Sequence, residues 1–304
     1  MKSNIYDVII IGAGPAGLTS AIYSARYKMK TLVLFKEIGG QMMLAYDIEN
    51  YPGFRKVSGE ELTKKMKAQV DDLKVDMRNE EVVNIVKEQK YYSITTGSNT
   101  YKCSAVILSL GTKYKKLNLP EEEKFIGKGL SYCVACDAPL FKDKIVAVIG
   151  GSNSAVMDSV VLSKYAKKIY VIYRGKELRA EPLRIEEIKR SKKTEIIYDA
   201  EIKKINGKNF VESVILSNNR EIKINGLFIE IGSVPVIYIT KKLNIKTDDC
   251  GYIITDKNMA TNVGGVFAAG DCISKSFRQI ATAVNDGCIA AFSAYNYIKK
   301  EIKK

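Results

Sequence analysis

Two cysteines three positions apart, Cys133 and Cys136, have the residue type and spacing best suited to chemistry in this chain. Sulfurs at this spacing can close a small disulfide without a large backbone movement, and one thiol of such a pair is often a thiolate near neutral pH. In a cytosolic protein such a pair is more often catalytic or metal-binding than structural. The remaining cysteines are isolated in the sequence and are expected to pack as small apolar side chains: Cys103, Cys250, Cys272 and Cys288.

A zinc site is the alternative use of this cysteine pair. Structural zinc takes four ligands, which are mostly thiolates and imidazoles. The 304 residues include no histidine and no second C-x-x-C motif, so the sequence predicts that no metal is bound. The absence of histidine also excludes imidazole as a general acid or base in any step of a mechanism.

Two glycine-rich turns, each between an apolar strand-like run and a helix-like run, predict two dinucleotide-binding units. The first follows Tyr6–Ile11 and reads Gly12-Ala13-Gly14-Pro15-Ala16-Gly17, and the second follows Ile145–Ile149 and reads Gly150-Gly151-Ser152-Asn153-Ser154-Ala155. In the first turn, Gly12 permits the tight bend, Gly14 lets the backbone approach a pyrophosphate, and Gly17 lets the helix pack closely on the strand. The phosphates of the ligand are expected at the N-terminus of the helix.

The first unit departs from the usual pattern at the ribose. An acidic side chain is expected near position 35, after a strand over Thr31–Leu34, but the chain has Phe35 there. Either Glu37 takes this role or the ribose is held in another way.

The order of the segments predicts the domain organisation. Strand-like and helix-like runs alternate over about twice the usual domain length, which predicts an α/β protein with two Rossmann-like dinucleotide-binding domains. The polar segment Lys113–Glu123 is expected to be one crossing, and Asn244–Gly251 the other. The second domain, 114–246, would thus be inserted into a discontinuous first domain, 1–113 and 247–304. We also expect an antiparallel meander within Val82–Cys103 and a long helix from about Gln279.

Three further segments carry a resemblance to a known family. They are Gly39-Gly40-Gln41 with Glu49-Asn50-Tyr51-Pro52-Gly53, Gly270-Asp271 with Arg278-Gln279-Ile280-Ala281, and Ser131-Tyr132-Cys133-Val134-Ala135-Cys136-Asp137. Together with the glycine turns, they make nearly the whole chain resemble the low-molecular-weight FAD-dependent thioredoxin reductases. The resemblance implies that FAD is bound by residues of the first domain: Gly12, Gly14, Pro15, Ala16, Gly17, Gly40, Gln41, Asn50, Gly111, Gly270, Asp271, Arg278, Gln279 and Ala281.

The resemblance also implies the chemistry of the cysteine pair. In this family the reduced flavin passes two electrons to the disulfide, the second cysteine lies nearer the flavin, and the first attacks the partner protein. Carried over to this chain, Cys136 and Cys133 take these roles, and Asp137 supplies and takes the proton. The implied partner is thioredoxin or a thioredoxin-like protein. The implied assembly is a homodimer, in which the inserted domain rotates during turnover.

The second glycine turn and the segment after the next strand depart from the family's pattern for NADPH. Ser152 stands in place of a glycine, whereas Gly150 and Ala155 fit. In the segment that grips the 2′-phosphate, Arg174 and Arg179 are kept, but Gly175 replaces an arginine. The loss of one charge-assisted hydrogen bond to a phosphate costs about 1.5–3 kcal/mol. NADPH or NADH remains the expected donor, bound by Gly150, Ser152, Ala155, Arg174 and Arg179, and reduced ferredoxin is the alternative donor.

Composition narrows the other possibilities. The net charge is +14 and the pI about 9.3, but the lysines are scattered and no nucleic-acid-binding motif accompanies them, so the charge favours an acidic protein partner over nucleic acid. The longest apolar runs are far too short to cross a bilayer, and no signal-peptide pattern is present, so a cytoplasmic protein is expected. A flavin-dependent ferredoxin–NADP reductase is disfavoured because close relatives of that type lack the cysteine pair. Nothing in the sequence recommends a non-enzymatic redox sensor.

Overall fold

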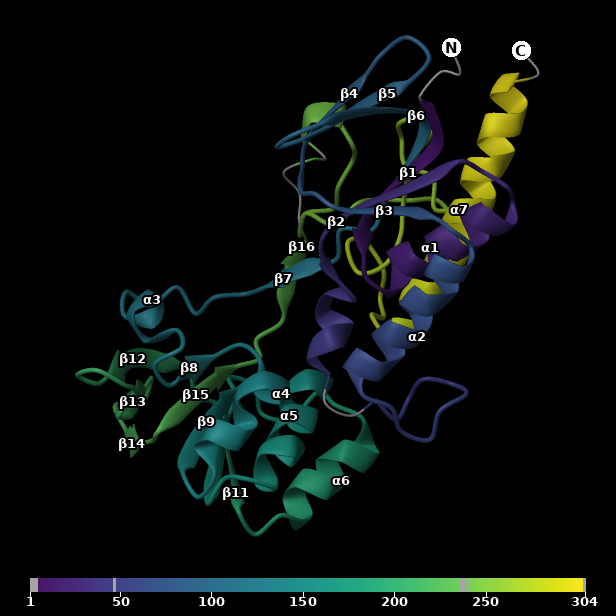
Figure 1. Cartoon of the computed structure of the whole chain (residues 1–304). Helices are drawn as coiled ribbons and strands as arrows, with labels where there is room; N and C mark the ends of the chain where they lie inside the picture. The colour runs from purple at the N-terminus through teal and green to yellow at the C-terminus, as the bar shows by residue number, and fades with distance from the viewer. Residues whose placement is uncertain (1–4, 46–47, 236–238, 240, 303–304) are drawn as a thin grey trace. The chain divides into compact units, whose positions relative to one another are not determined.

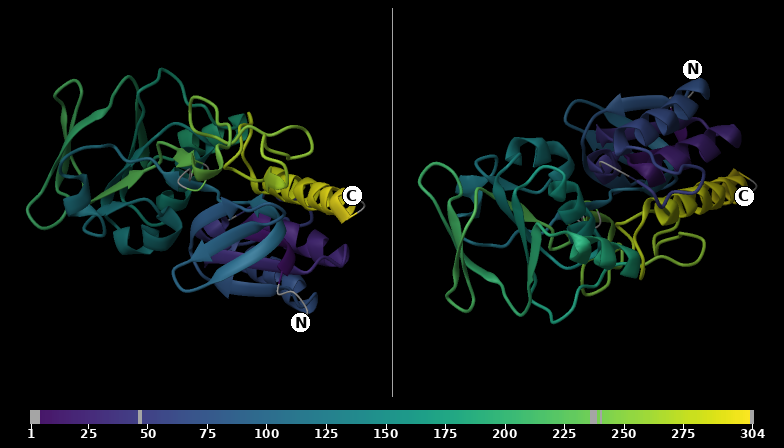
Figure 2. Two further views of the ribbon diagram at one scale, coloured as in Figure 1. Left: turned by 90° about the horizontal axis from the view of Figure 1, so that it is seen from above. Right: turned by 90° about the horizontal axis from the view of Figure 1, so that it is seen from below.

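The computed structural model describes residues 5–45, 48–235, 239 and 241–302 (Figure 1). The chain forms two compact units, Met1–Lys113 with Val234–Lys304, and Tyr114–Ser233. Each unit contains a sheet with a parallel part that helices cover, so the expected α/β fold with two Rossmann-like units is confirmed. Figure 2 shows the N-terminal segment in purple and the C-terminal helix in yellow within the same unit.

The second crossing between the units lies earlier in the chain than the sequence suggested. The contacts divide at Ser233/Val234 rather than at 246/247. The reason is hydrophobic burial, because Ile239, Leu243 and Ile245 belong to an apolar core of the first unit. The two crossing segments pair as a two-stranded sheet of β7 (Thr112–Tyr114) and β16 (Ser233–Pro235).

The sheet of the first unit has the order β3-β2-β1-β6-β5-β4, with β17 beside β6. Its strands are β1 (Ile5–Ala13), β2 (Thr31–Ile38), β3 (Asp76–Asn79), β4 (Val82–Lys87), β5 (Tyr92–Thr96), β6 (Thr100–Leu108) and β17 (Val266–Ala268). Strand β1 pairs in parallel with β2 and β6, and Val8, Ile9 and Ile10 are fully buried, as expected for a central parallel strand. Strands β4, β5 and β6 are antiparallel neighbours, which confirms the expected meander.

Helices pack on this sheet and on each other. The first unit contains α1 (Pro15–Arg26), η1 (Gly40–Leu44), α2 (Gly59–Asp72), η3 (Lys241–Leu243) and α7 (Ile280–Ile302). Ser58 caps the N-terminus of helix α2, and its hydroxyl accepts a hydrogen bond from the Glu61 amide at 3.1 Å. Helices α1 and α7 lie side by side (Figure 1), and the Ser20 hydroxyl of α1 donates to the Gly287 carbonyl at 3.0 Å. Helix α7 begins at Ile280, one residue after the expected start at about Gln279.

The second unit has a five-stranded parallel sheet of order β11-β10-β9-β15-β8 and a three-stranded antiparallel sheet of order β12-β13-β14. Its strands are β8 (Leu130–Ser131), β9 (Ile145–Ile149), β10 (Lys168–Ile172), β11 (Thr194–Ile197), β12 (Ile202–Asn206), β13 (Ser213–Leu216), β14 (Glu221–Lys223) and β15 (Gly226–Ile229). Its helices are α3 (Glu122–Phe125), α4 (Val134–Asp137), η2 (Ala138–Phe141), α5 (Asn153–Ser163) and α6 (Pro182–Arg190). Among the described helices of the whole chain, none is long and apolar enough to span a bilayer.

Candidate functional site

The first glycine-rich turn connects β1 to α1, and its glycines are required by packing. Gly12 has a φ of +108°, and a Cβ atom there would overlap the Ser109 carbonyl oxygen. A Cβ atom on Gly17 would overlap the Gly12 carbonyl oxygen, so helix and strand can approach only with glycine at this position. Gly14 is the N-cap of α1, and a Cβ atom there would meet nothing nearer than the Gly39 carbonyl oxygen at 3.9 Å. The turn therefore leaves room for a ligand at the N-terminus of α1.

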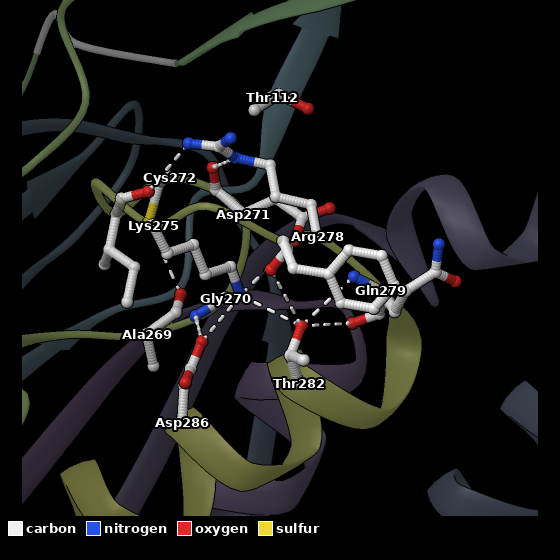
Figure 3. A network of polar contacts seen from close by, with 12 residues as sticks. Thr112, Ala269, Gly270, Asp271, Cys272, Lys275, Arg278, Gln279, Thr282 and Asp286 are labelled. Carbon is white, nitrogen blue, oxygen red and sulfur yellow. Dashed lines mark hydrogen bonds and ion pairs between the residues drawn. The ribbon is translucent and has the colours of Figure 1, made fainter. Parts of the chain in front are cut away.

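The Gly270-Asp271 turn lies against the start of α1. Gly270 has a φ of +84°, and a Cβ atom there would come within 2.9 Å of the Ala16 Cβ atom. The Asp271 side chain is half-buried, and burial raises the pKa of its carboxyl group, while Lys275 and Arg278 oppose this shift. Among the described residues, no group donates a hydrogen bond to Asp271 Oδ1, which lies 3.6 Å from Lys275 Nζ (Figure 3).

An unsatisfied, buried carboxylate oxygen points to a ligand that donates a hydrogen bond. The hydroxyl groups of a flavin dinucleotide have this chemistry. Together with the uncovered N-terminus of α1, Asp271 makes the residues present fit a dinucleotide whose phosphates lie at the helix and whose hydroxyls reach the carboxylate.

Arg278 fixes the same turn rather than extending into solvent. Its Nε donates to the Asp271 carbonyl at 3.2 Å and its Nη2 to the Ile273 carbonyl at 3.0 Å. The guanidinium also lies 3.8 Å from the ring centroid of Tyr252, a cation–π contact. Tyr252 was not expected from the sequence, because a lone tyrosine has no motif of its own.

The remaining residues expected at the flavin come from several segments of the first unit. Gln41 Nε2 donates to the carbonyl and the hydroxyl of Thr112, at 2.8 and 2.9 Å. Thr112 directly follows Gly111 in the sequence, so these contacts bring Gln41 close to Gly111. Asn50 Nδ2 donates to Gln279 Oε1 at 3.2 Å, just before α7, and Ala281 is the second residue of that helix. A Cβ atom on Gly40 would lie 3.5 Å from the Gly14 Cα atom, so this segment faces the glycine turn.

The position expected for the ribose ligand, directly after a strand over Thr31–Leu34, does not follow a strand in the structure. Strand β2 continues to Ile38, so Phe35 and Glu37 both lie within it. Phe35 is half-buried and packs against the core, whereas Glu37 is exposed. Glu37 stays one of the two alternatives expected for holding the ribose.

The segment with the cysteine pair lies in the second unit, where β8 leads into the short helix α4. Cys133 is half-buried and disulfide-bonded. Its amide donates to the Ser131 hydroxyl at 3.0 Å, and its carbonyl accepts a hydrogen bond from the Asp137 amide at 3.2 Å. The side chain of Cys136 is outside the part of the chain that the structure describes. The backbone contacts hold Cys133 at the start of α4 and place Asp137 one turn further along.

The isolated cysteines follow the expectation only in part. Cys103 and Cys272 are buried and unoxidised, and burial raises the pKa of both thiols, that of Cys272 to about 11. Cys250 is exposed and Cys288 is half-buried, so the expectation of apolar packing is wrong for Cys250. No group of three or more histidine, cysteine, aspartate or glutamate side chains suited to a metal occurs among the described residues.

The second glycine turn borders a cleft of about 720 Å³ within the second unit. Gly150 has a φ of +143°, and a Cβ atom there would overlap the Glu230 carbonyl oxygen. The Arg179 amide donates to the Gly151 carbonyl at 2.6 Å, which places Arg179 beside the turn. The cleft is lined by four of the five residues expected at a nicotinamide nucleotide: Gly150, Ser152, Arg174 and Arg179. The fifth, Ala155, is buried in α5 behind the turn.

Tyr173 and Gly175, which flank Arg174, form one structural feature. The Tyr173 ring packs over both Gly151 and Gly175, because a Cβ atom on either would lie 2.7 or 2.6 Å from ring carbons of Tyr173. A larger residue at position 175 would have to displace this ring. The nearby Arg174 is exposed and lies 3.9 Å from Glu201, which also lines the cleft.

The cleft also has an acidic element that no motif indicated. Glu230 lines it, is only 8% exposed, and is hydrogen-bonded to Asp158 of α5. Burial raises the pKa of both carboxyl groups, that of Asp158 to about 6 and that of Glu230 to about 9, and the two negative charges repel each other. The pair therefore shares one proton at neutral pH. Burial, and to a smaller extent the charges of the same two carboxyl groups, raise the pKa of Tyr114 on β7.

Comparisons with known proteins agree with these features. The family model described as pyridine nucleotide-disulphide oxidoreductase matches residues 6–287. The chain is 42% identical to the "34.2 kDa protein in rubredoxin operon" of Clostridium pasteurianum, over 96% of this chain and 97% of that protein. It is 38% identical to a thioredoxin reductase of Listeria monocytogenes, over 98% and 96%.

Two solved structures are also similar. Lactococcus lactis thioredoxin reductase superimposes with a TM-score of 0.94 at 37% identity, over 97% of this chain and 99% of that one. A ferredoxin-flavin thioredoxin reductase of Clostridium acetobutylicum superimposes with a TM-score of 0.53 at 35% identity, over 98% and 99%. The chain belongs to the pyridine nucleotide-disulphide oxidoreductase family, whose cofactors are a flavin and a nicotinamide nucleotide, and within it to the low-molecular-weight thioredoxin reductases. It is thus an enzyme of the oxidoreductase class.

Proposed function

We propose that this protein is an FAD-dependent reductase of thioredoxin or a thioredoxin-like protein, acting through a Cys133–Cys136 disulfide. The observation that carries this proposal is the disulfide-bonded state of Cys133 in a chain that also has a fitting dinucleotide site. The thioredoxin reductases of similar sequence support the choice of partner.

Each group of residues has a part in the proposed reaction. The Gly12–Gly17 turn binds the FAD phosphates, and Asp271 accepts a hydrogen bond from a hydroxyl. Reduced FAD bound there would supply two electrons, which together with two protons convert the disulfide into two thiols. The Cys133 thiolate then attacks the disulfide of the partner, and one partner sulfur leaves as a thiolate. Attack by Cys136 on the mixed disulfide restores the Cys133–Cys136 bond and releases the partner as a dithiol, with Asp137 as the proton carrier.

A nicotinamide nucleotide is the donor that the cleft of the second unit supports best. The cleft presents the glycine turn, Arg174 and Arg179, and Lys115 and Lys116 add positive charge to its lining. Cations attract the phosphates of NADPH or NADH. The missing arginine at Gly175 disfavours the 2′-phosphate, so NADH competes more evenly with NADPH here than in relatives that have this arginine.

Reduced ferredoxin is the second candidate donor. The Tyr173 ring over Gly151 favours it, because the ring covers backbone that a bound pyrophosphate would approach. The similarity to a ferredoxin-flavin thioredoxin reductase supports the same alternative. Under both hypotheses the net charge of +14 suits an acidic partner protein, and a homodimer in the cytoplasm remains our prediction.

Thiol formation tests the proposal. The purified protein is mixed under anaerobic conditions with oxidised thioredoxin and, separately, with NADPH, NADH or chemically reduced ferredoxin. Thioredoxin thiols should appear catalytically with at least one donor, and the active donor identifies the route. The proposal is wrong if no donor yields thioredoxin thiols although the protein contains FAD.

A further inference from the structure

Asp286 of α7 is a buried carboxylate outside every motif discussed so far. Only 5% of the residue is exposed. A carboxylate that is buried without partners is strongly unfavourable, so its contacts show what it is placed to do.

Both partners of Asp286 belong to the turn that carries Asp271. Asp286 Oδ2 accepts a hydrogen bond from the Gly270 amide at 3.2 Å and from Lys275 Nζ at 2.7 Å. Figure 3 shows the Gly270 amide and the Lys275 ammonium group both in contact with the Asp286 carboxylate. Helix α7 therefore holds the turn in place through one side chain.

Lys275 lies between two carboxylates. Its ammonium group is 2.7 Å from Asp286 Oδ2 and 3.6 Å from Asp271 Oδ1, and it also donates to the Thr282 hydroxyl at 3.3 Å. The Lys275 side chain is 14% exposed, so water screens these interactions little. The shorter contact holds the ammonium group on Asp286, and Asp271 Oδ1 is then left without a hydrogen bond.

The same part of α7 also fixes the glycine turn. Gly287, next to Asp286, packs so closely on α1 that a Cβ atom there would overlap the Ala16 carbonyl oxygen. The Ser20 hydroxyl donates to the Gly287 carbonyl. Two consecutive residues of α7 thus set the position of the Gly270-Asp271 turn relative to the N-terminus of α1.

We propose that Asp286 is a positioning residue for the flavin nucleotide. Asp286 holds Lys275 away from Asp271, so that Asp271 Oδ1 can accept a hydrogen bond from a ligand hydroxyl. This inference rests on the proposed binding of FAD. Without the Asp286 charge, Lys275 would pair with Asp271 instead, and the ligand would compete with an internal ammonium group for the same oxygen.

The test uses the full-length protein and two substitutions. Asp286→Asn keeps the size of the side chain and an oxygen for the Gly270 amide, but it releases Lys275. We expect the FAD dissociation constant, measured by flavin fluorescence on rebinding to the apoprotein, to rise by roughly tenfold or more, since hydrogen bonds to charged groups are involved. Adding Lys275→Met should restore a large part of the affinity, because Asp271 is then free again.

Controls separate this mechanism from a loss of folding. Asp72→Asn removes a carboxylate at the exposed end of α2 and should leave FAD affinity unchanged. Thermal unfolding of each apoprotein checks that the variants fold. Wild-type affinity in Asp286→Asn would overturn the inference. A loss that Lys275→Met does not relieve would also overturn it, because Asp286 would then act only in packing. If the wild-type protein itself does not bind FAD, the proposed function fails instead.

Discussion

Replacing Glu230 by glutamine should change how the stability of the protein depends on pH. Glu230 is buried beside Asp158, and its pKa in the folded protein is raised from 4.5 to about 9. The folded state binds the Glu230 proton more tightly than the unfolded state does, so protonated Glu230 stabilises the folded protein. This contribution to the free energy of unfolding is complete below the Glu230 pKa of the unfolded chain and is lost as the pH rises through the pKa of the folded protein. At this group the folded state holds about one proton more than the unfolded chain at pH 7 and about half a proton more at pH 9.

This difference sets the magnitude of the effect. One proton corresponds to about 1.4 kcal/mol per pH unit, so the wild-type free energy of unfolding should fall by roughly 2 kcal/mol from pH 7 to pH 9 through this group. Glu230→Gln keeps a neutral hydrogen-bonding side chain and cannot ionise, so most of that loss should disappear. The partner carboxyl of Asp158, with a pKa of about 6, is already ionised over this range and stays so in both proteins.

Urea unfolding followed by far-UV circular dichroism measures the effect at both pH values. Glu201→Gln serves as the matched control, because Glu201 lines the same cleft but is exposed. The control should show the wild-type pH dependence. An equal fall in stability for wild type and Glu230→Gln would refute the inference that the buried pair holds a proton.

Three further predictions follow from local geometry. Gly17→Ala should abolish FAD retention, measured by the flavin absorbance of the purified protein, because the added Cβ atom would overlap the Gly12 carbonyl oxygen. The control Gly97→Ala has open space around the added Cβ atom and should retain FAD. Cys133→Ser should keep its FAD but form no thioredoxin thiols, and measurable turnover would contradict the assigned role. Gly175→Arg alone should not improve NADPH binding, because the Tyr173 ring occupies the space beside position 175. In the double variant with Tyr173→His, the NADPH affinity measured by fluorescence titration should rise roughly tenfold. Equal affinities of the single and double variants would show that the ring does not control this site.

The parts of the site that are local in sequence could be predicted from it. A glycine turn between a strand and a helix carries its reason within a few residues, and the structure shows that reason at Gly12 and Gly17 as close backbone packing. The cysteine pair and the Gly270-Asp271 turn are equally local. The two Rossmann-like units followed from the repeated strand–turn–helix pattern.

Features that depend on distant residues could not be predicted in this way. Glu230 and Asp158 come from different elements, and neither belongs to a motif until the fold buries them together. The role of Asp286 depends on Lys275, which is shared with Asp271. The second boundary between the units depends on the burial of Ile239 and Leu243 in the first unit, and their short segment has no periodic pattern that would predict this burial.

A reductive titration under anaerobic conditions tests the central claim most directly. The flavin absorbance is followed while dithionite is added to the wild-type protein and, in parallel, to Cys133→Ser. If the disulfide accepts electrons through FAD, the wild-type protein should take up one two-electron equivalent more per flavin than the variant. Equal uptake by the two proteins would show that Cys133 is not part of the electron path, and the proposed reduction of thioredoxin through this disulfide would be wrong.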